Sequence, residues 1–282
     1  MYKKYRKLSD IFNRKFFYEI LNDSNNAERF IKENFKELCK VDVTYGKLYE
    51  DAYNILKNEY RCEYVYKNAI IQKKFLGTNS LNSAVVFEEL VIDNCKADLV
   101  IINSKSTVYE IKTELDSLKR LNRQLDTYMN VFEYTYVVTY EKNINSVLKV
   151  IPENVGVIIL TEKYTLKTIK KAKSNLNNIK SSNMFDMLRK KEYLNIIQKV
   201  YKKIPDVPNT KIYSVSKQLF ERIPSERAHK MMINELKKRK LKDYQKEFLN
   251  EVPLSLKVIG VENKITKIEC DKIKKFLSTS IN

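Results

Sequence analysis

The chain has 282 residues, a formal net charge of +18 and a hydrophobic content of 43%. This length allows one large domain or two small ones with a sizeable core, and 19 Tyr with 12 Phe argue against a disordered chain. No apolar run approaches the roughly 20 residues of a membrane span, and no apolar segment of a signal peptide follows the basic first residues. The composition therefore predicts a cytoplasmic protein without membrane segments.

The first part of the chain has the apolar periodicity of helices. The pattern predicts helices over residues 8–21, 27–39 and 47–60, separated by polar breaks at 23–26 and 44–46. We interpret residues 1–80 as an N-terminal helical part that packs on the core of the protein.

Residues 81–160 mix strand and helix patterns, and we interpret them as the core. The pattern predicts, in chain order, strands near 84–92, 98–103 and 107–113, a helix over 117–131, and strands near 135–139 and 155–160.

Charged residues interrupt two of these apolar strands. Residues two apart on a strand face the same side, so Glu110 and Lys112 project together. Because unpaired charges are expensive to bury, these two side chains need each other or a metal ion. Asp98 and Glu110 supply hard oxygen ligands of the kind that bind Mg²⁺ or Mn²⁺. The pattern predicts a metal site at which Lys112 orients the attacking water or stabilises the transition state.

Whether Asp98 joins this site depends on the strand register. Directly opposed residues of an antiparallel pair share a face, so Asp98 joins Glu110 only if the numbers of paired residues sum to an even value. We therefore expect a three- or five-residue loop, or a bulge, around residues 103–106, which pairs Asp98 with Glu110 or Lys112.

The predicted helix 117–131 carries further candidates. Gln124 lies about 80° from the centre of the apolar stripe, so it can lean over the sheet edge toward the site. Arg120, one turn earlier, is a candidate phosphate contact. Tyr128, one turn later, is a candidate for stacking on a base or supporting Gln124, with a core tyrosine as the alternative. Asp116 and Ser117 fit helix capping better than catalysis.

Together these residues resemble the PD-(D/E)xK nuclease superfamily. Asp98, Glu110-Ile111-Lys112 and Gln124 resemble its Asp, Glu-x-Lys and helix-borne Gln. Residues 84–140 are similar, more narrowly, to an uncharacterised bacterial family of that superfamily known only by a locus-tag name. The resemblance implies an α/β (α+β) fold with a restriction-endonuclease-like α-β-β-β-α-β core. Glu89 matches an acidic residue of that family, so either it adds a third carboxylate near the metal or it is a charge on an edge strand.

The last part of the chain is strongly basic. Residues 161–282 hold 29 Lys and Arg against 13 Asp and Glu, whereas residues 1–160 hold 24 against 22. From Thr161 onward the pattern is helical, with breaks at 204–209 and 223–225. We interpret 161–282 as a basic, mainly helical region suited to phosphate contacts. The tract Lys237, Lys238, Arg239 and Lys240 either extends this nucleic-acid-binding surface or is a solvated helix face.

Cysteine and histidine usage argues against zinc ribbons and excludes zinc sites of the two-histidine type. The four cysteines form no Cys-x-x-Cys motif, and His229 is the single histidine, which we expect at the surface or in a cap. Four glycines make a phosphate-binding loop implausible. Metal chemistry must therefore rest on carboxylates.

The leading prediction is a Mg²⁺- or Mn²⁺-dependent nuclease acting on DNA, with defence, mobile-element biology or repair suggested by fold analogy alone. Two alternatives stay open: a nucleic-acid-binding protein that keeps the fold without catalysis, and a protein-interaction module. The intact set Asp98, Glu110, Lys112 and Gln124 argues against the first alternative. The expected partner is nucleic acid, with a homodimer or a partner protein left open.

Overall fold

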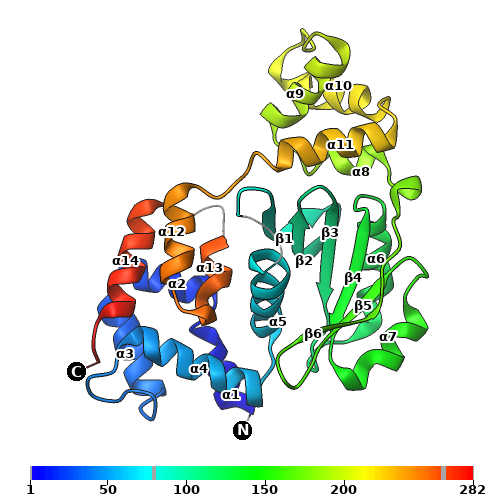
Figure 1. Cartoon of the computed structure of the whole chain (residues 1–282). Helices are drawn as coiled ribbons and strands as arrows, with labels where there is room; N and C mark the ends of the chain where they lie inside the picture. The colour runs from blue at the N-terminus through cyan, green and yellow to red at the C-terminus, as the bar shows by residue number, and fades with distance from the viewer. Residues whose placement is uncertain (1, 78–80, 262–264, 282) are drawn as a thin grey trace.

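One six-stranded sheet organises the chain, and its strands lie in sequence order from β1 to β6. The computed structural model describes residues 2–77, 81–261 and 265–281. The strands are β1 (Val85–Ile92), β2 (Cys95–Ile102), β3 (Ser106–Ile111), β4 (Tyr134–Thr139), β5 (Gly156–Leu160) and β6 (Leu166–Lys170). The pairs β1–β2, β2–β3 and β5–β6 are antiparallel, whereas β3, β4 and β5 run parallel. The protein is therefore a mixed α/β protein (Figure 1).

Helices surround this sheet. The α-helices are α1 (Tyr2–Asp10), α2 (Arg14–Asn22), α3 (Ser24–Asn34), α4 (Tyr45–Glu59), α5 (Glu63–Ile70), α6 (Leu121–Met129), α7 (Ile144–Val150), α8 (Ser181–Phe185), α9 (Lys190–Tyr201), α10 (Asn209–Glu221), α11 (Ser225–Leu236), α12 (Asp243–Glu251), α13 (Lys257–Val261) and α14 (Lys267–Ser278). Shorter turns are the π-helix η1 (Ile71–Leu76) and the 3₁₀ turns η2 (Leu118–Arg120), η3 (Glu141–Asn143), η4 (Leu176–Asn178) and η5 (Leu254–Leu256). No helix in the described part of the chain is long and apolar enough to cross a membrane.

The two faces of the sheet belong to two different apolar clusters. Leu99 and Tyr109 pack with α1–α5 and with the C-terminal helices α12–α14. Val100 and Val108 point to the opposite face and pack with Tyr128 of α6 and with α8–α11. A third, smaller cluster joins α6 and α7 to β4 and β5. The C-terminal region after residue 160 is thus shared between two packing units (Figure 1).

The predicted core strands and the helix of α6 are confirmed to within a few residues, but the N-terminal prediction needs correction. The helix expected over 8–21 is divided into α1 and α2, because the Asn13 side chain accepts a hydrogen bond from the Phe16 N–H at 2.8 Å and starts a new helix. The helix α5 was not predicted.

The region after Thr161 also departs from its helical prediction. Residues 161–165 form a tight turn, in which the Thr161 N–H donates to the Thr165 carbonyl at 2.9 Å, and β6 then pairs with β5. Pairing with the open edge of β5 overrides the local helical pattern. The predicted breaks at 204–209 and 223–225 are confirmed, since α9, α10 and α11 are separated there.

His229 is buried, which corrects the expectation of a surface position. Its Nε2 lies 2.8 Å from the Ser106 Oγ at the start of β3, and its side chain joins α11 to the sheet. Burial lowers its pKa from 6.5 to about 4, so the ring is neutral near pH 7.

Candidate active site

The β2–β3 hairpin sets the register that the site requires. Leu99 pairs with Tyr109 and Ile102 with Ser106, so paired residue numbers sum to an even value and the connecting loop has three residues. The even sum and the three-residue loop are as predicted. The paired residues end at Leu99 and Tyr109, and the Asp98 carboxylate accepts a hydrogen bond from the Ile111 N–H of the neighbouring strand.

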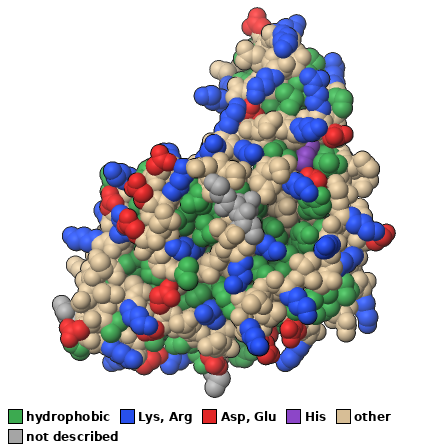
Figure 2. Space-filling view, in the orientation of Figure 1, with side chains coloured by type: hydrophobic (Ala, Val, Ile, Leu, Met, Phe, Trp, Pro, Cys, Tyr) green, Lys and Arg blue, Asp and Glu red, His purple; other side chains and the backbone are tan. Residues whose placement is uncertain are grey.

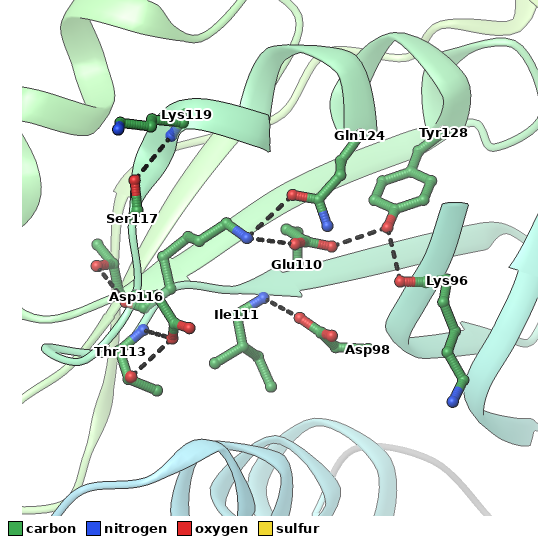
Figure 3. Close-up of polar contacts among 12 residues, drawn as sticks. Lys96, Asp98, Glu110, Ile111, Thr113, Asp116, Ser117, Lys119, Gln124 and Tyr128 are labelled. Carbon is green, nitrogen blue, oxygen red and sulfur yellow. Dashed lines mark hydrogen bonds and ion pairs between the residues drawn. The ribbon is translucent and has the colours of Figure 1, made fainter. Parts of the chain in front are cut away.

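Glu110 and Lys112 form a buried ion pair. The Lys112 Nζ lies 2.7 Å from the Glu110 Oε1, and the two side chains are 9% and 1% exposed. The same ammonium donates to the Gln124 Oε1 at 3.0 Å (Figure 3). Gln124 thus reaches from α6 to the charged pair, and the structure brings these three predicted residues together.

Tyr128 holds the other oxygen of Glu110. Its hydroxyl lies 2.9 Å from the Glu110 Oε2 and 3.0 Å from the Lys96 carbonyl oxygen. The tyrosine side chain is completely buried, so it has no surface on which a base could stack. The expected base contact is corrected: Tyr128 is a core tyrosine that orients Glu110 (Figure 3).

Asp98 is half-buried and lies where the site meets solvent. Its Oδ2 accepts a hydrogen bond from the Ile111 N–H at 2.6 Å. Burial, followed by the negative charges of Glu110 and Glu63, raises the pKa of Asp98 from 3.8 to about 8. Burial also raises the pKa of Glu110, although the Lys112 ammonium opposes this shift. An added positive charge would therefore stabilise the ionised form of both carboxyl groups.

Asp98 and Glu110 offer carboxylate oxygens of the kind that bind divalent cations. Mg²⁺ is commonly held by one or two carboxylates, with waters and substrate phosphates completing its octahedron. Asp98 and Glu110 are the residues that would hold it. Within the described residues, no group of three or more His, Cys, Asp or Glu side chains is placed to hold a metal ion.

Glu89, the predicted third carboxylate, is not brought into this set. It adopts a left-handed backbone conformation, with φ of 52°, between the paired residues Glu88 and Leu90. Its half-exposed carboxylate forms ion pairs with Lys96 and, at 3.6 Å, with Lys67. The kink in β1 thus directs Glu89 toward these lysines.

Two residues of α5 lie near Asp98 and were missed by sequence reasoning. Glu63 raises the pKa of Asp98 and Lys67 lowers it, so both act on its charge. The buried Lys67 ammonium lies 2.7 Å from a Glu63 carboxylate oxygen. Both side chains line a cleft of about 600 Å³ between α1, α2, α5, β1 and α13. The four-residue spacing of Glu63 and Lys67 was the available signal, but it also describes an ordinary helix-surface pair.

The predicted nucleic-acid contacts lie in different environments. Arg120 is exposed just before α6, one turn from Gln124. Arg239 is largely buried, with its Nε 2.7 Å from the Glu192 Oε1. In the same tract, Lys237 is half-buried, and Lys238 is exposed and pairs with Glu235, whereas Lys240 is exposed.

The loop after β3 has a capping role, as predicted. The Ser117 Oγ accepts a hydrogen bond from the Lys119 N–H at 3.3 Å, and the Asp116 Oδ2 accepts from the Thr113 N–H at 2.9 Å (Figure 3). Asp116 closes the turn before η2, whereas Ser117 caps η2 itself.

The chain is similar to a known family of phage proteins. A family model described as Bacteriophage P4 protein cII matches residues 56–280. Protein cII of Enterobacteria phage P4 is 38% identical over 80 residues, which cover 28% of this chain and 30% of that relative. The aligned part is thus less than a third of the relative's length. No solved structure matches the chain.

Proposed function

We propose that this chain, which belongs to the bacteriophage P4 protein cII family, is a metal-dependent nuclease whose active site contains Asp98, Glu110 and Lys112. One observation carries the proposal: a buried ammonium is fixed between the Glu110 carboxylate and the Gln124 amide, with Asp98 on the adjacent strand, where its carboxylate accepts a hydrogen bond from the Ile111 N–H. A purely structural core position would not require charge here, because burying charge is costly.

The order of elements supports the same reading. Helix α5, strands β1–β3, helix α6 and strand β4 follow one another in the α-β-β-β-α-β order that the resemblance to PD-(D/E)xK nucleases implies. Asp98 of β2, Glu110 of β3, Lys112 directly after β3 and Gln124 of α6 follow the chain order of the residues in that resemblance. DNA is the proposed substrate, and the phage origin of the relative favours a mobile-element context.

The chain's own residues would divide the chemistry. A bound Mg²⁺ or Mn²⁺ would lower the pKa of a coordinated water and neutralise phosphoryl charge. Asp98 and Glu110 would hold the ion, and Tyr128 keeps the Glu110 carboxylate in place. The Lys112 ammonium, oriented by Gln124, would direct the attacking water or stabilise negative charge on the phosphoryl oxygens.

One observation favours the non-catalytic alternative, in which the protein binds nucleic acid without cleaving it. The Glu110–Lys112 pair is already satisfied internally, and no group of three metal-binding side chains occurs among the described residues. A nuclease assay decides between the two functions.

The assay uses single- and double-stranded DNA and RNA with Mg²⁺, Mn²⁺ or EDTA. We expect metal-dependent cleavage that is abolished by Asp98→Ala, Glu110→Ala and Lys112→Ala and reduced less by Gln124→Ala. Lys119→Ala is the matched control, because this exposed lysine lies near the site without contacting it through its side chain. Circular dichroism melts, together with the near-isosteric Asp98→Asn and Lys112→Met, separate loss of chemistry from loss of folding. Undiminished cleavage by Lys112→Ala would contradict the proposed roles.

A further inference from the structure

The positive charge of the chain is concentrated in one part of the structure. Residues 181–240, which contain α8–α11, hold 15 Lys and Arg against 6 Asp and Glu, a net charge of +9. Residues 241–282 hold 8 against 6, a net charge of +2. The basic C-terminal region predicted from the sequence is therefore uneven, and α12–α14 contribute little to its excess charge.

Packing separates the same two segments. Helices α8–α11 pack with the sheet face that carries Val100 and Val108, whereas α12–α14 pack with the N-terminal helices. We call residues 181–240 the basic bundle. It forms a lobe at one end of the sheet (Figure 1) and shows more basic than acidic side chains in Figure 2.

Several acidic side chains of the basic bundle are neutralised within it. Glu235 is 1% exposed and binds Lys199 and Lys238. Glu192 pairs with Arg239, and Asp186 pairs with Lys217. Because each of these pairs cancels positive as well as negative charge, the excess of +9 is carried by the remaining cations of the segment.

Exposed cations without a counter-ion remain on α9–α11 and in the loop between α9 and α10. Four of them form no ion pair with any residue in the described ranges: Lys191, Lys203, Lys211 and Arg227. Protein surfaces that bind a nucleic-acid backbone carry such clusters of solvated Lys and Arg, because each phosphate contact releases condensed counter-ions.

We propose that the basic bundle binds the phosphate backbone of a nucleic-acid duplex that extends to the candidate site. The part of this proposal that concerns cleavage rests on the proposed function; the binding surface does not. His229 of α11 contacts Ser106 at the start of β3, and Glu110 lies four residues further along that strand.

This placement sets a minimum length for a substrate that uses both regions. At about 3.3 Å per strand residue, Ser106 and Glu110 are roughly 13 Å apart along β3. Successive phosphates of one DNA strand are about 3.4 Å apart along the axis, so the stretch of β3 between the bundle contact and Glu110 is as long as about four base pairs. Longer duplexes have room to contact both regions.

The test compares two variants with the same change in charge. In the bundle variant, Lys191, Lys203, Lys211 and Arg227 are changed together to Glu; in the control variant, Lys3, Lys15, Lys267 and Lys275 are changed to Glu. All eight side chains are exposed, and the control residues lie on the N- and C-terminal helices outside the bundle. Binding is measured by fluorescence anisotropy in EDTA with DNA and RNA duplexes of about 24 base pairs.

We expect the bundle variant to raise Kd at least about 30-fold and to lower the salt slope by about 3.6, since each of four phosphate contacts contributes about 0.9 to that slope. The control variant should change Kd less than about threefold, because its charges lie on helices outside the bundle. A comparable loss of duplex affinity in both variants would overturn the proposal. Binding of the protein to phosphatidylserine vesicles but not to either duplex would overturn it as well. Absence of cleavage in the separate nuclease assay would refute the proposed function and leave this binding result intact.

Discussion

The candidate site and the basic bundle both depend on charged side chains, but they hold them in opposite environments. Glu110 and Lys112 are buried, and each charge has fixed partners at hydrogen-bond distance. Lys203 and Lys211 of the bundle are exposed to solvent. Buried charges act through specific geometry, whereas solvated charges act through their number. Single substitutions should therefore have large effects in the first environment and small ones in the second.

The largest effect should come from a bundle residue that is not solvated. Arg239 lies in the basic tract but is buried against Glu192, with side-chain exposures of 11% and 12%. Arg239→Ala should lower the free energy of unfolding by about 3 kcal/mol, because it leaves a buried carboxylate without its partner. Lys240→Ala, its exposed neighbour, should stay within about 0.5 kcal/mol. Urea denaturation measures the free energy of unfolding of both variants. Equal values would show that Arg239 behaves as a solvated side chain.

The pH dependence of stability tests the buried carboxyl of Asp98. Folding raises its pKa from 3.8 to about 8, so the folded state holds this proton more tightly than the unfolded state. The metal-free protein should therefore lose stability as the pH rises through this window. His229 contributes with the opposite sign, but only between pH 6.5 and about 4, where its depressed pKa costs stability as the pH falls.

Between pH 6.5 and 8 the histidine no longer contributes, so the change reports Asp98 together with the neighbouring Glu110 carboxyl group, whose pKa is also raised. We expect Tm to fall by several degrees across this range, Asp98→Asn to flatten the profile, and Mg²⁺ to stabilise the protein more at the higher pH, because a metal binds the ionised carboxylate. A wild-type profile that matches Asp98→Asn would refute the shifted pKa.

A smaller effect should follow from removing the hydroxyl that orients Glu110. Tyr128→Phe should cost about 1 kcal/mol of stability and weaken Mn²⁺ binding about 10-fold, as is typical when a hydrogen-bond partner of a metal ligand is lost. Calorimetric titration with Mn²⁺ measures the affinity. Tyr134→Phe serves as the control, because its hydroxyl contacts Lys105 away from the site. Unchanged affinity in Tyr128→Phe would remove its positioning role.

The smallest effect should come from one solvated cation. Lys211→Ala should change the duplex Kd by less than about threefold, since a single phosphate contact is one of many in a non-specific interface. Anisotropy titrations at low and high salt measure this change. An increase in Kd as large as that of the four-residue bundle variant would mean that Lys211 makes a specific contact. The contrast between the two regions would then fail.

The residues of the candidate site were predictable from the sequence because their signal is local. Alternation along β2 and β3 assigns Asp98, Glu110 and Lys112 to one face once the loop length is known. The helical periodicity of α6 likewise predicts that Gln124 points toward that face, where it contacts Lys112. Glu89 was not predictable in this way, because its left-handed conformation interrupts the alternation on which the reasoning depends.

The sequence by itself determined the strand pattern of the core, the spacing of the charged residues and the basic excess after residue 160, since these follow from periodicity and composition. Tertiary structure decided which charges are buried and with what partners. Arg239 pairs with Glu192, Tyr128 with Glu110, and His229 with Ser106, and the two members of each pair are distant in the sequence. It also divided the basic region between two packing units. The physical reason is that burial and pairing depend on contacts between distant segments, which no local pattern encodes.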